Sequence, residues 1–152
     1  MGKSWGVLVV LNIKKHVKKL IKKYNTNNPY ELCDYLHIKI LYEELGSIKG
    51  FYQAAPKNRI IHINCNLDDK DMLWTLAHEL GHALRHSHLN ILFLEKHTYI
   101  VKNKYEIEAD TFAAELLIDD NLLNEYEGLT LENIAKSENL DPKFLEYKFL
   151  SK

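Results

Sequence analysis

Residues 69–85 read DKDMLWTLAHELGHALR, and the spacing of apolar side chains in this stretch predicts an amphipathic helix. Seven apolar residues recur at three- and four-residue intervals: Met72, Leu73, Leu76, Ala77, Leu80, Ala83 and Leu84. The acidic run Asp68, Asp69 and Asp71 suits a helix start, because carboxylates cap unpaired N–H groups and favour the positive end of the helix dipole. We therefore expect a helix from about Asp69 to Arg85, packed through one face on the core.

This helix contains an H-E-x-x-H motif formed by His78, Glu79 and His82. Two imidazoles four residues apart lie about 40° apart around a helix axis and about 6 Å apart along it. That separation suits two ligands of one Zn²⁺, and Glu79 is placed to act as a general base on a water at the metal. The alternative is a surface helix with incidental histidines, since so short a motif also arises by chance.

A third ligand has to come from elsewhere, and the stretch 105–117, YEIEADTFAAELL, is the candidate. Its pattern predicts a second helix with an apolar stripe of Ala109, Phe112, Ala113, Leu116 and Leu117. Glu106 and Asp110 share one face of that helix, whereas Glu108 lies about 200° around the axis from Glu106. One of these two carboxylates could bind the metal while the other accepts the N–H of a ligating histidine. The alternative for Glu106 is a solvated carboxylate in a first helical turn.

With these two motifs, the chain resembles the ImmA/IrrE family of zinc metallopeptidases over most of its length. The resemblance matches His78, His82 and Glu106 to the metal ligands, Glu79 to the catalytic base and Asp110 to a carboxylate that supports the ligands. It implies a zincin-like core and intracellular, site-specific cleavage of a helix-turn-helix repressor, often encoded beside the peptidase in mobile elements or phage. Because members of the family have other partners, the resemblance leaves the substrate open.

Three further histidines follow the motif, at His86, His88 and His97. We expect structural or solvated roles for them, because three protein ligands leave the open position that a catalytic zinc needs. The stretch 89–104 is expected to be a loop or a short irregular segment. Tyr99 and Tyr105 are candidates for stabilising an oxyanion, a role that phenols can take, but the sequence fixes no geometry for them.

The rest of the chain predicts an α+β fold with a small sheet. Stretches 38–42, 50–55 and 59–64 are rich in β-branched and aromatic residues, which is typical of strands. Together they predict a three-stranded sheet, antiparallel or mixed, packed against helices. An edge strand beside the metal site could hold an extended substrate by backbone pairing.

Residues 1–152 are expected to form one domain in three parts. Residues 12–118 form the core with the zinc site, and begin with a helix over 12–24 whose lysine face we interpret as solvated; nucleic acid, a membrane surface or an acidic partner is the alternative. Residues 1–11 are a possible extension, either an extra strand or disordered. Residues 119–152 form a C-terminal helical subdomain for packing and substrate docking.

Net charge and cysteine content indicate which cellular compartment and which binding partners to expect. The net charge is −1, and Arg59 and Arg85 are the only arginines, which disfavours direct nucleic-acid binding. Cys33 and Cys65 lie far apart and form no C-x-x-C motif, which favours a reducing compartment. The apolar run 5–11 is too short to span a bilayer and has no cleavage site after it. We therefore expect a cytoplasmic protein without membrane contact.

The sequence thus predicts a zinc-dependent endopeptidase that cleaves a helix-turn-helix repressor. The alternative is a metal-stabilised regulatory protein, an anti-repressor that acts by contact without cleavage. In that case the metal site would be structural, and a fourth protein ligand such as His86 or His97 would close it.

Overall fold

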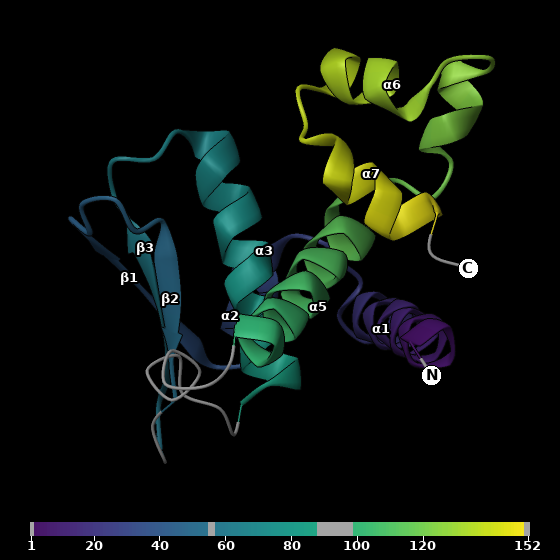
Figure 1. Cartoon of the computed structure of the whole chain (residues 1–152). Coiled ribbons are helices and arrows are strands. Elements are labelled where there is room, and N and C mark those ends of the chain that lie inside the picture. Colours follow the sequence, from purple (N-terminus) through teal and green to yellow (C-terminus); the bar gives the residue numbers. More distant parts are fainter. Residues whose placement is uncertain (1, 55–56, 88–98, 151–152) are drawn as a thin grey trace.

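The computed structural model describes residues 2–54, 57–87 and 99–150, and it shows a small sheet on one side of a group of helices (Figure 1). The elements from the N-terminus are α1 (Gly2–Tyr24), α2 (Pro29–Tyr35), β1 (Ile38–Glu43), β2 (Gly50–Gln53), β3 (Arg59–Asn64) and α3 (Asp69–Arg85). They are followed by α5 (Tyr99–Leu117), a 3₁₀ helix η1 (Leu122–Tyr126), α6 (Leu131–Glu138) and α7 (Pro142–Phe149). This arrangement confirms the expected α+β class.

The sheet is mixed, with strand order β1-β3-β2. Strand β1 runs parallel to β3, with Ile38 opposite Arg59, and β2 runs antiparallel to β3, with Gly50 opposite Ile63. Ile61 and Ile63 are buried against the helices because alternate residues of a strand point to the same face. Because β3 lies between the other two strands, β2 is an edge strand, and it contacts α3.

Helix α3 lies between the sheet on one side and α5 on the other (Figure 1). It begins as expected, because the Asp68 side chain accepts a hydrogen bond from the backbone N–H of Asp71 at 2.7 Å. Gly81 allows the close approach of α5: a Cβ atom added there would lie 3.1 Å from the Cβ of Phe112, whose side chain is fully buried. The glycine inside the motif therefore brings the two helices that carry the candidate ligands together.

Residues 2–11 differ from both expectations for the stretch 1–11. Residues 2–11 belong to the same helix as 12–24, rather than forming an extra strand or a disordered extension. The physical reason is the continued stripe of Val9, Ile13 and Val17, which packs on the common core at helical spacing.

Helix α5 also begins earlier than expected, at Tyr99 rather than near Tyr105. The interpretation of residues 99–104 as irregular is therefore wrong. This stretch contains no proline or glycine to stop a helix, and helix formation propagates readily from a turn that is already formed. His88, His97 and the rest of segment 88–98 lie outside the described residues.

The C-terminal helices share a second, smaller core with the end of α5. Its buried members are Ala114, Ile118, Leu122, Ile134, Ala135 and Leu145. Two of these helices begin at side-chain caps: Thr130 accepts a hydrogen bond from the N–H of Asn133, and Asp141 accepts one from the N–H of Lys143. Helix α7 thereby packs on α5, the helix that carries Glu106 and Asp110.

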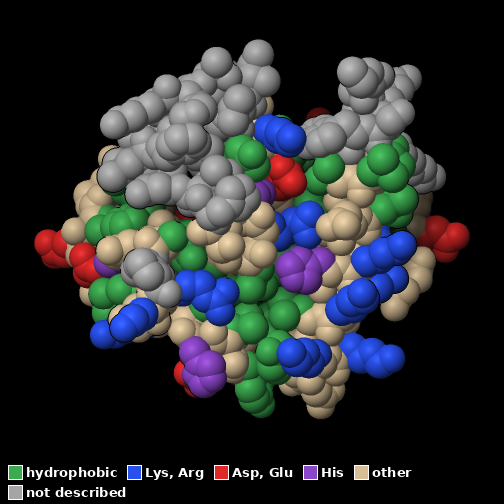
Figure 2. All heavy atoms as spheres, turned by 90° about the horizontal axis from the view of Figure 1, so that it is seen from below, with side chains coloured by type: hydrophobic (Ala, Val, Ile, Leu, Met, Phe, Trp, Pro, Cys, Tyr) green, Lys and Arg blue, Asp and Glu red, His purple; other side chains and the backbone are tan. Residues whose placement is uncertain are grey.

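Helix α1 carries seven lysines and no acidic residue. Five of these lysines are exposed: Lys15, Lys18, Lys19, Lys22 and Lys23. Figure 2 shows several basic side chains together on the side of the molecule where α1 lies. None of the helices in the described part of the chain combines the length and the apolar character needed to cross a membrane.

Candidate metal centre

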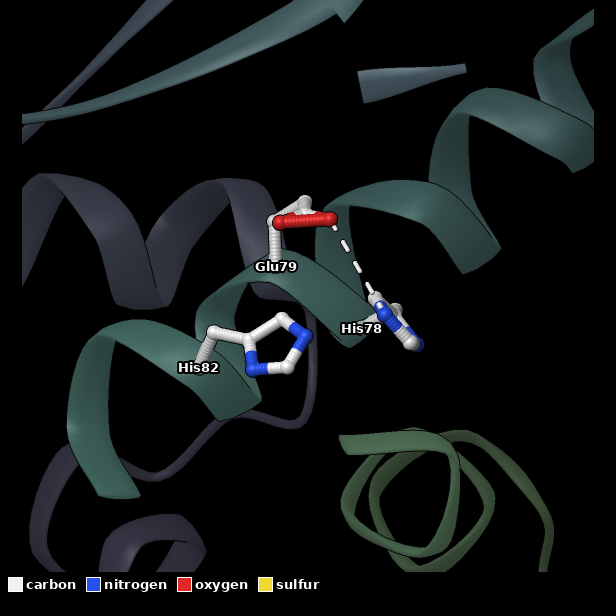
Figure 3. A group of neighbouring side chains, drawn as sticks. All are labelled: His78, Glu79 and His82. Carbon is white, nitrogen blue, oxygen red and sulfur yellow. Dashed lines mark ion pairs between the residues drawn. The ribbon is translucent and has the colours of Figure 1, made fainter. Parts of the chain in front are cut away.

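The motif residues His78 and His82 project from successive turns of α3, with Glu79 next to His78, and both imidazole rings lie on the side that faces α5 (Figure 3). Each residue offers one possible ligand atom, and these atoms lie within 4.8 Å of one another. The ring centroids of His78 and His82 are 4.8 Å apart. The helical spacing read from the sequence is therefore realised in space.

Glu106 of α5 completes this cluster from the facing helix. Its Oε2 lies 3.0 Å from Nε2 of His78, and its Oε1 lies 3.0 Å from Nε2 of His82. The nearest Glu79 oxygen is 3.9 Å from the same His78 nitrogen, so Glu106 is the closer carboxylate. Bonds of about 2.0–2.1 Å to a tetrahedral zinc place ligand atoms about 3.3 Å apart, which is close to the observed separations. Two imidazoles and one carboxylate in this arrangement fit a small divalent cation.

Asp110 contacts the opposite edge of the His78 ring. Its Oδ1 lies 2.7 Å from Nδ1 of His78, so a proton on that nitrogen donates to the carboxylate and leaves Nε2 to face Glu106. The other oxygen of Asp110 lies 3.4 Å from Nζ of Lys143, which comes from α7. The C-terminal helices therefore reach the surroundings of the motif, a contact that no pattern in the sequence signalled.

Burial and pairing shift the pKa values of these groups strongly. Burial lowers the pKa of His78, but its hydrogen bonds with Asp110 and Glu106 outweigh that effect and raise the pKa to about 10. Burial raises the pKa of Glu106, but its hydrogen bonds with His78 and His82 bring the pKa below its usual range. Burial raises the pKa of Glu79. The cluster is thus a place where negative carboxylates attract a positive charge, carried either by a proton or by a cation.

The Glu79 carboxylate is buried in the cluster with one oxygen that makes no hydrogen bond to a described residue. Glu79 is 4% exposed, and its Oε2 is the oxygen without a partner among the described residues. Buried polar atoms are nearly always paired in proteins, and exceptions point to a catalytic role or to a partner bound in use. The Glu79 carboxylate is therefore available to accept a proton from a molecule at this site.

His86, a candidate fourth ligand, lies behind His82 instead of beside the other donors. Its Nδ1 is 3.0 Å from Nδ1 of His82, whereas the Nε2 of His82 faces Glu106. Tyr105 packs edge-on against the His86 ring, with centroids 4.7 Å apart, and is not among the residues that line the cleft. The side chain of Tyr99 and the whole of His97 lie outside the described residues.

A cleft of about 460 Å³ opens over the cluster. Its lining includes His78, Glu79, Glu106 and Asp110, with Gly50 at the start of β2, Trp74 and Thr75 of α3, and Lys143 and Phe144 of α7. At Gly50 an added Cβ would lie 2.7 Å from the carbonyl oxygen of His62 and 2.8 Å from Cγ2 of Thr75. Only glycine fits there, so the edge strand enters the cleft in close contact with α3.

Comparison with known proteins is consistent with this geometry. Residues 33–146 match a peptidase family described as the IrrE N-terminal-like domain. The chain is 40% identical over 142 residues to the uncharacterized immunity region protein 2 of Bacillus phage phi105, covering 91% of this chain and 90% of that protein. It is 38% identical over 142 residues to the metallopeptidase ImmA of Bacillus subtilis (strain 168), covering 90% of this chain and 83% of that protein.

Proposed function

Because the chain belongs to the peptidase family of the IrrE N-terminal-like domain, we propose that it is a zinc-dependent endopeptidase that cleaves a helix-turn-helix repressor at one site. The observation that carries this proposal is the position of the Glu106 carboxylate, 3.0 Å from Nε2 of both motif histidines. The metallopeptidase role follows from the family, whereas the metal, the residue roles and the substrate are our proposal.

We assign His78, His82 and Glu106 as the ligands of the ion. Two imidazoles with one carboxylate form a set typical of catalytic zinc, which keeps one coordination position open. His86 turns its Nδ1 toward His82, which disfavours a closed structural site made with His86. A bound zinc ion supplies Lewis acidity that activates a water and polarises the scissile carbonyl.

The surrounding residues then have separate roles. Glu79 accepts the proton of the attacking water and passes it to the nitrogen of the leaving amine. Asp110 accepts the Nδ1–H of His78 and so holds that ring with Nε2 toward the ion. The edge strand β2 offers backbone groups along the cleft, where an extended substrate segment can add as a further strand.

The substrate is proposed from the relatives and from the family resemblance. One relative is named for a phage immunity region and another is named a metallopeptidase. A repressor that maintains such immunity fits both names. We expect the reaction to take place in the cytoplasm, with neither nucleic acid nor membrane bound directly by the peptidase.

The test is cleavage of the helix-turn-helix repressor encoded beside this protein. The zinc-loaded protein should release one defined fragment, detected by mass spectrometry. Glu79→Gln should retain stoichiometric zinc and slow cleavage by about 10²–10⁴-fold, the usual contribution of a general base. The exposed Glu127→Gln variant is the matched control and should cleave at the wild-type rate.

Two outcomes would overturn the proposal. Wild-type cleavage by Glu79→Gln would remove the assigned base. Release of the repressor from DNA by intact, zinc-loaded protein without any fragment would favour the anti-repressor that acts by contact.

A further inference from the structure

His86 lies one helical turn beyond His82, at the end of α3. Its backbone N–H donates to the carbonyl oxygen of His82 at 2.8 Å, so the helical path continues and stacks the two rings. The two Nδ1 atoms are 3.0 Å apart, and His86 is only 4% exposed. Water therefore has little access to His86, and its nearest polar neighbours are protein groups.

The short contact between two Nδ1 atoms restricts the protonation of both rings. Two nitrogens can share a hydrogen bond only if one carries a proton and the other offers a lone pair. His82 turns its Nε2 toward Glu106 at 3.0 Å, and a metal ligand needs its lone pair on that nitrogen. The proton of His82 then belongs on Nδ1, and Nδ1 of His86 is the acceptor.

The far nitrogen of His86 faces a carboxylate from the neighbouring helix. Its Nε2 lies 3.8 Å from Oε2 of Glu108, beyond hydrogen-bond length but close enough for charge attraction. Neither atom has a hydrogen-bond partner among the described residues, and both are buried. A carboxylate at this position favours a proton on Nε2 of His86, which leaves Nδ1 free to accept from His82.

The two motif histidines are thus supported in different ways. His78 has a direct carboxylate partner in Asp110, 2.7 Å from its Nδ1. Among the residues that the structure describes, no carboxylate lies at the equivalent place of His82, which contacts the His86 ring instead. Tyr105 packs edge-on against His86 from α5 and restricts the rotation of that ring.

We propose that His86 is a positioning residue, which accepts the Nδ1–H of His82 and so holds the His82 ring with Nε2 directed at the metal, while the charge of Glu108 favours the proton of His86 on Nε2. The inference rests on the ligand assignment proposed above. A supporting partner of this kind typically changes metal affinity by about 10–100-fold when it is removed.

The test compares His86→Leu with His86→Asn, two side chains of similar size. The Oδ1 of asparagine occupies the position of histidine Nδ1 and can accept the same hydrogen bond, whereas leucine has no acceptor. Zinc alone is titrated against a competing chelator, so no substrate is needed. His86→Leu should raise the zinc dissociation constant about 10–100-fold, and His86→Asn should recover at least about tenfold of that loss.

A spectroscopic measurement checks the direction of the hydrogen bonds. In the zinc-loaded wild-type protein, ¹⁵N chemical shifts should place the proton of His82 on Nδ1 and that of His86 on Nε2. A proton on Nδ1 of His86 would overturn the proposal. Urea unfolding of the zinc-free variants identifies the range in which each is folded, so that affinities are compared between folded proteins.

The outcomes separate this inference from the proposed function. If the wild-type protein binds no zinc, both fail. If it binds zinc and His86→Leu binds it equally tightly, only the positioning role fails. Equal weakening in His86→Leu and His86→Asn would mean that His86 acts through packing, which also overturns the positioning role.

Discussion

Two groups of titratable side chains gather around helix α5, and they differ in how their buried atoms are paired. The metal-site group, formed with α3, consists of His78, Glu79, His82, His86, Glu106, Glu108 and Asp110. The lysine group, at the C-terminal end of α5, consists of Lys14, Glu115, Asp120 and Lys148. Three buried atoms of the first group lack hydrogen-bond partners among the described residues: Glu79 Oε2, His86 Nε2 and Glu108 Oε2.

In the lysine group, opposite charges are matched. The side chain of Lys148 is 1% exposed, and its Nζ donates to the carbonyl oxygens of Glu115 and Ile118 and lies 2.8 Å from a carboxylate oxygen of Asp120. Glu115 also pairs with Lys14 at 3.2 Å, although the geometry leaves its Oε1 without a hydrogen bond. Lys148 of α7 therefore donates to carbonyl oxygens in the last turn of α5 and directly after it, where the helix itself supplies no N–H partners.

The difference indicates that the lysine group links helices, whereas the metal-site group binds a partner. The lysine group connects α1, α5 and α7 through paired charges, so it requires nothing from outside the chain. The metal-site group keeps unpaired buried atoms, a cost that native proteins accept chiefly where another partner binds or reacts. Substitutions in the lysine group should therefore change stability, whereas those in the metal-site group should change zinc binding.

The largest stability effect is expected for Lys148→Met. The buried carboxylate of Glu115 lies 4.0 Å from Nζ of Lys148. Removing Lys148 leaves this charge and the carbonyl groups unmatched, which costs about 3–5 kcal/mol of unfolding free energy. Urea unfolding of the zinc-free protein measures this loss, and zinc affinity should stay within about twofold of wild type in the range where the variant is folded. Lys136→Met, at an exposed position, is the control, with an expected change below about 0.5 kcal/mol. Equal stability of the two variants would contradict the structural role of Lys148.

Gly81→Val should affect both properties, because Gly81 sets the spacing between α3 and α5. Forcing a branched side chain against Phe112 is expected to cost about 1–3 kcal/mol of unfolding free energy. It should also weaken zinc binding, since Glu106 moves away from the histidines. Gly81→Ala is the matched control: its gain in helix propensity of about 1 kcal/mol offsets part of the contact with Phe112. Tighter zinc binding by Gly81→Val in a chelator titration would refute this account of the helix spacing.

Asp110→Asn is expected to weaken zinc binding about tenfold, because the neutral amide polarises the Nδ1–H of His78 less than a carboxylate does. Its effect on unfolding should be smaller than that of Lys148→Met. Calorimetric zinc titration and urea unfolding of the same preparation separate the two quantities. Asp34→Asn, an exposed substitution, should alter neither. Unchanged zinc affinity in Asp110→Asn would remove Asp110 from the metal-site group.

The smallest effect is expected for Lys14→Met. Because the Lys14 side chain is 33% exposed, solvent screens its pair with Glu115, and the loss should be about 1 kcal/mol or less. The same urea experiment measures it. A loss equal to that of Lys148→Met would mean that Lys14, rather than Lys148, is the main partner of Glu115.

Local patterns were sufficient for the elements that carry the candidate site. The bounds of α3, its start at Asp68 and the proximity of His78 to His82 depend on residues within a turn or two of one another. The approach of Glu106 and Asp110 was expected from their shared helix face and from the family resemblance. The structure places both carboxylates against His78.

The residues at which α1 and α5 begin were harder to predict from the sequence, because these helices extend beyond the stretches with a clear pattern. Residues 2–11 became helical because Val9 continues the stripe that packs on the core, and α5 extends back to Tyr99 because nothing interrupts it. Periodicity over so few turns does not distinguish these outcomes from a strand or a loop.

By itself, the sequence determined the motif helix, the type of donor in the candidate metal site and the α+β class, because these depend on residue identity and short-range spacing. Only the tertiary structure decided the mixed strand order, the rotation of His86 behind His82, and the burial of Lys148 at the end of α5. Those features join residues that are distant in sequence or depend on how two helices meet. They are set by the packing of whole elements, which no local pattern encodes.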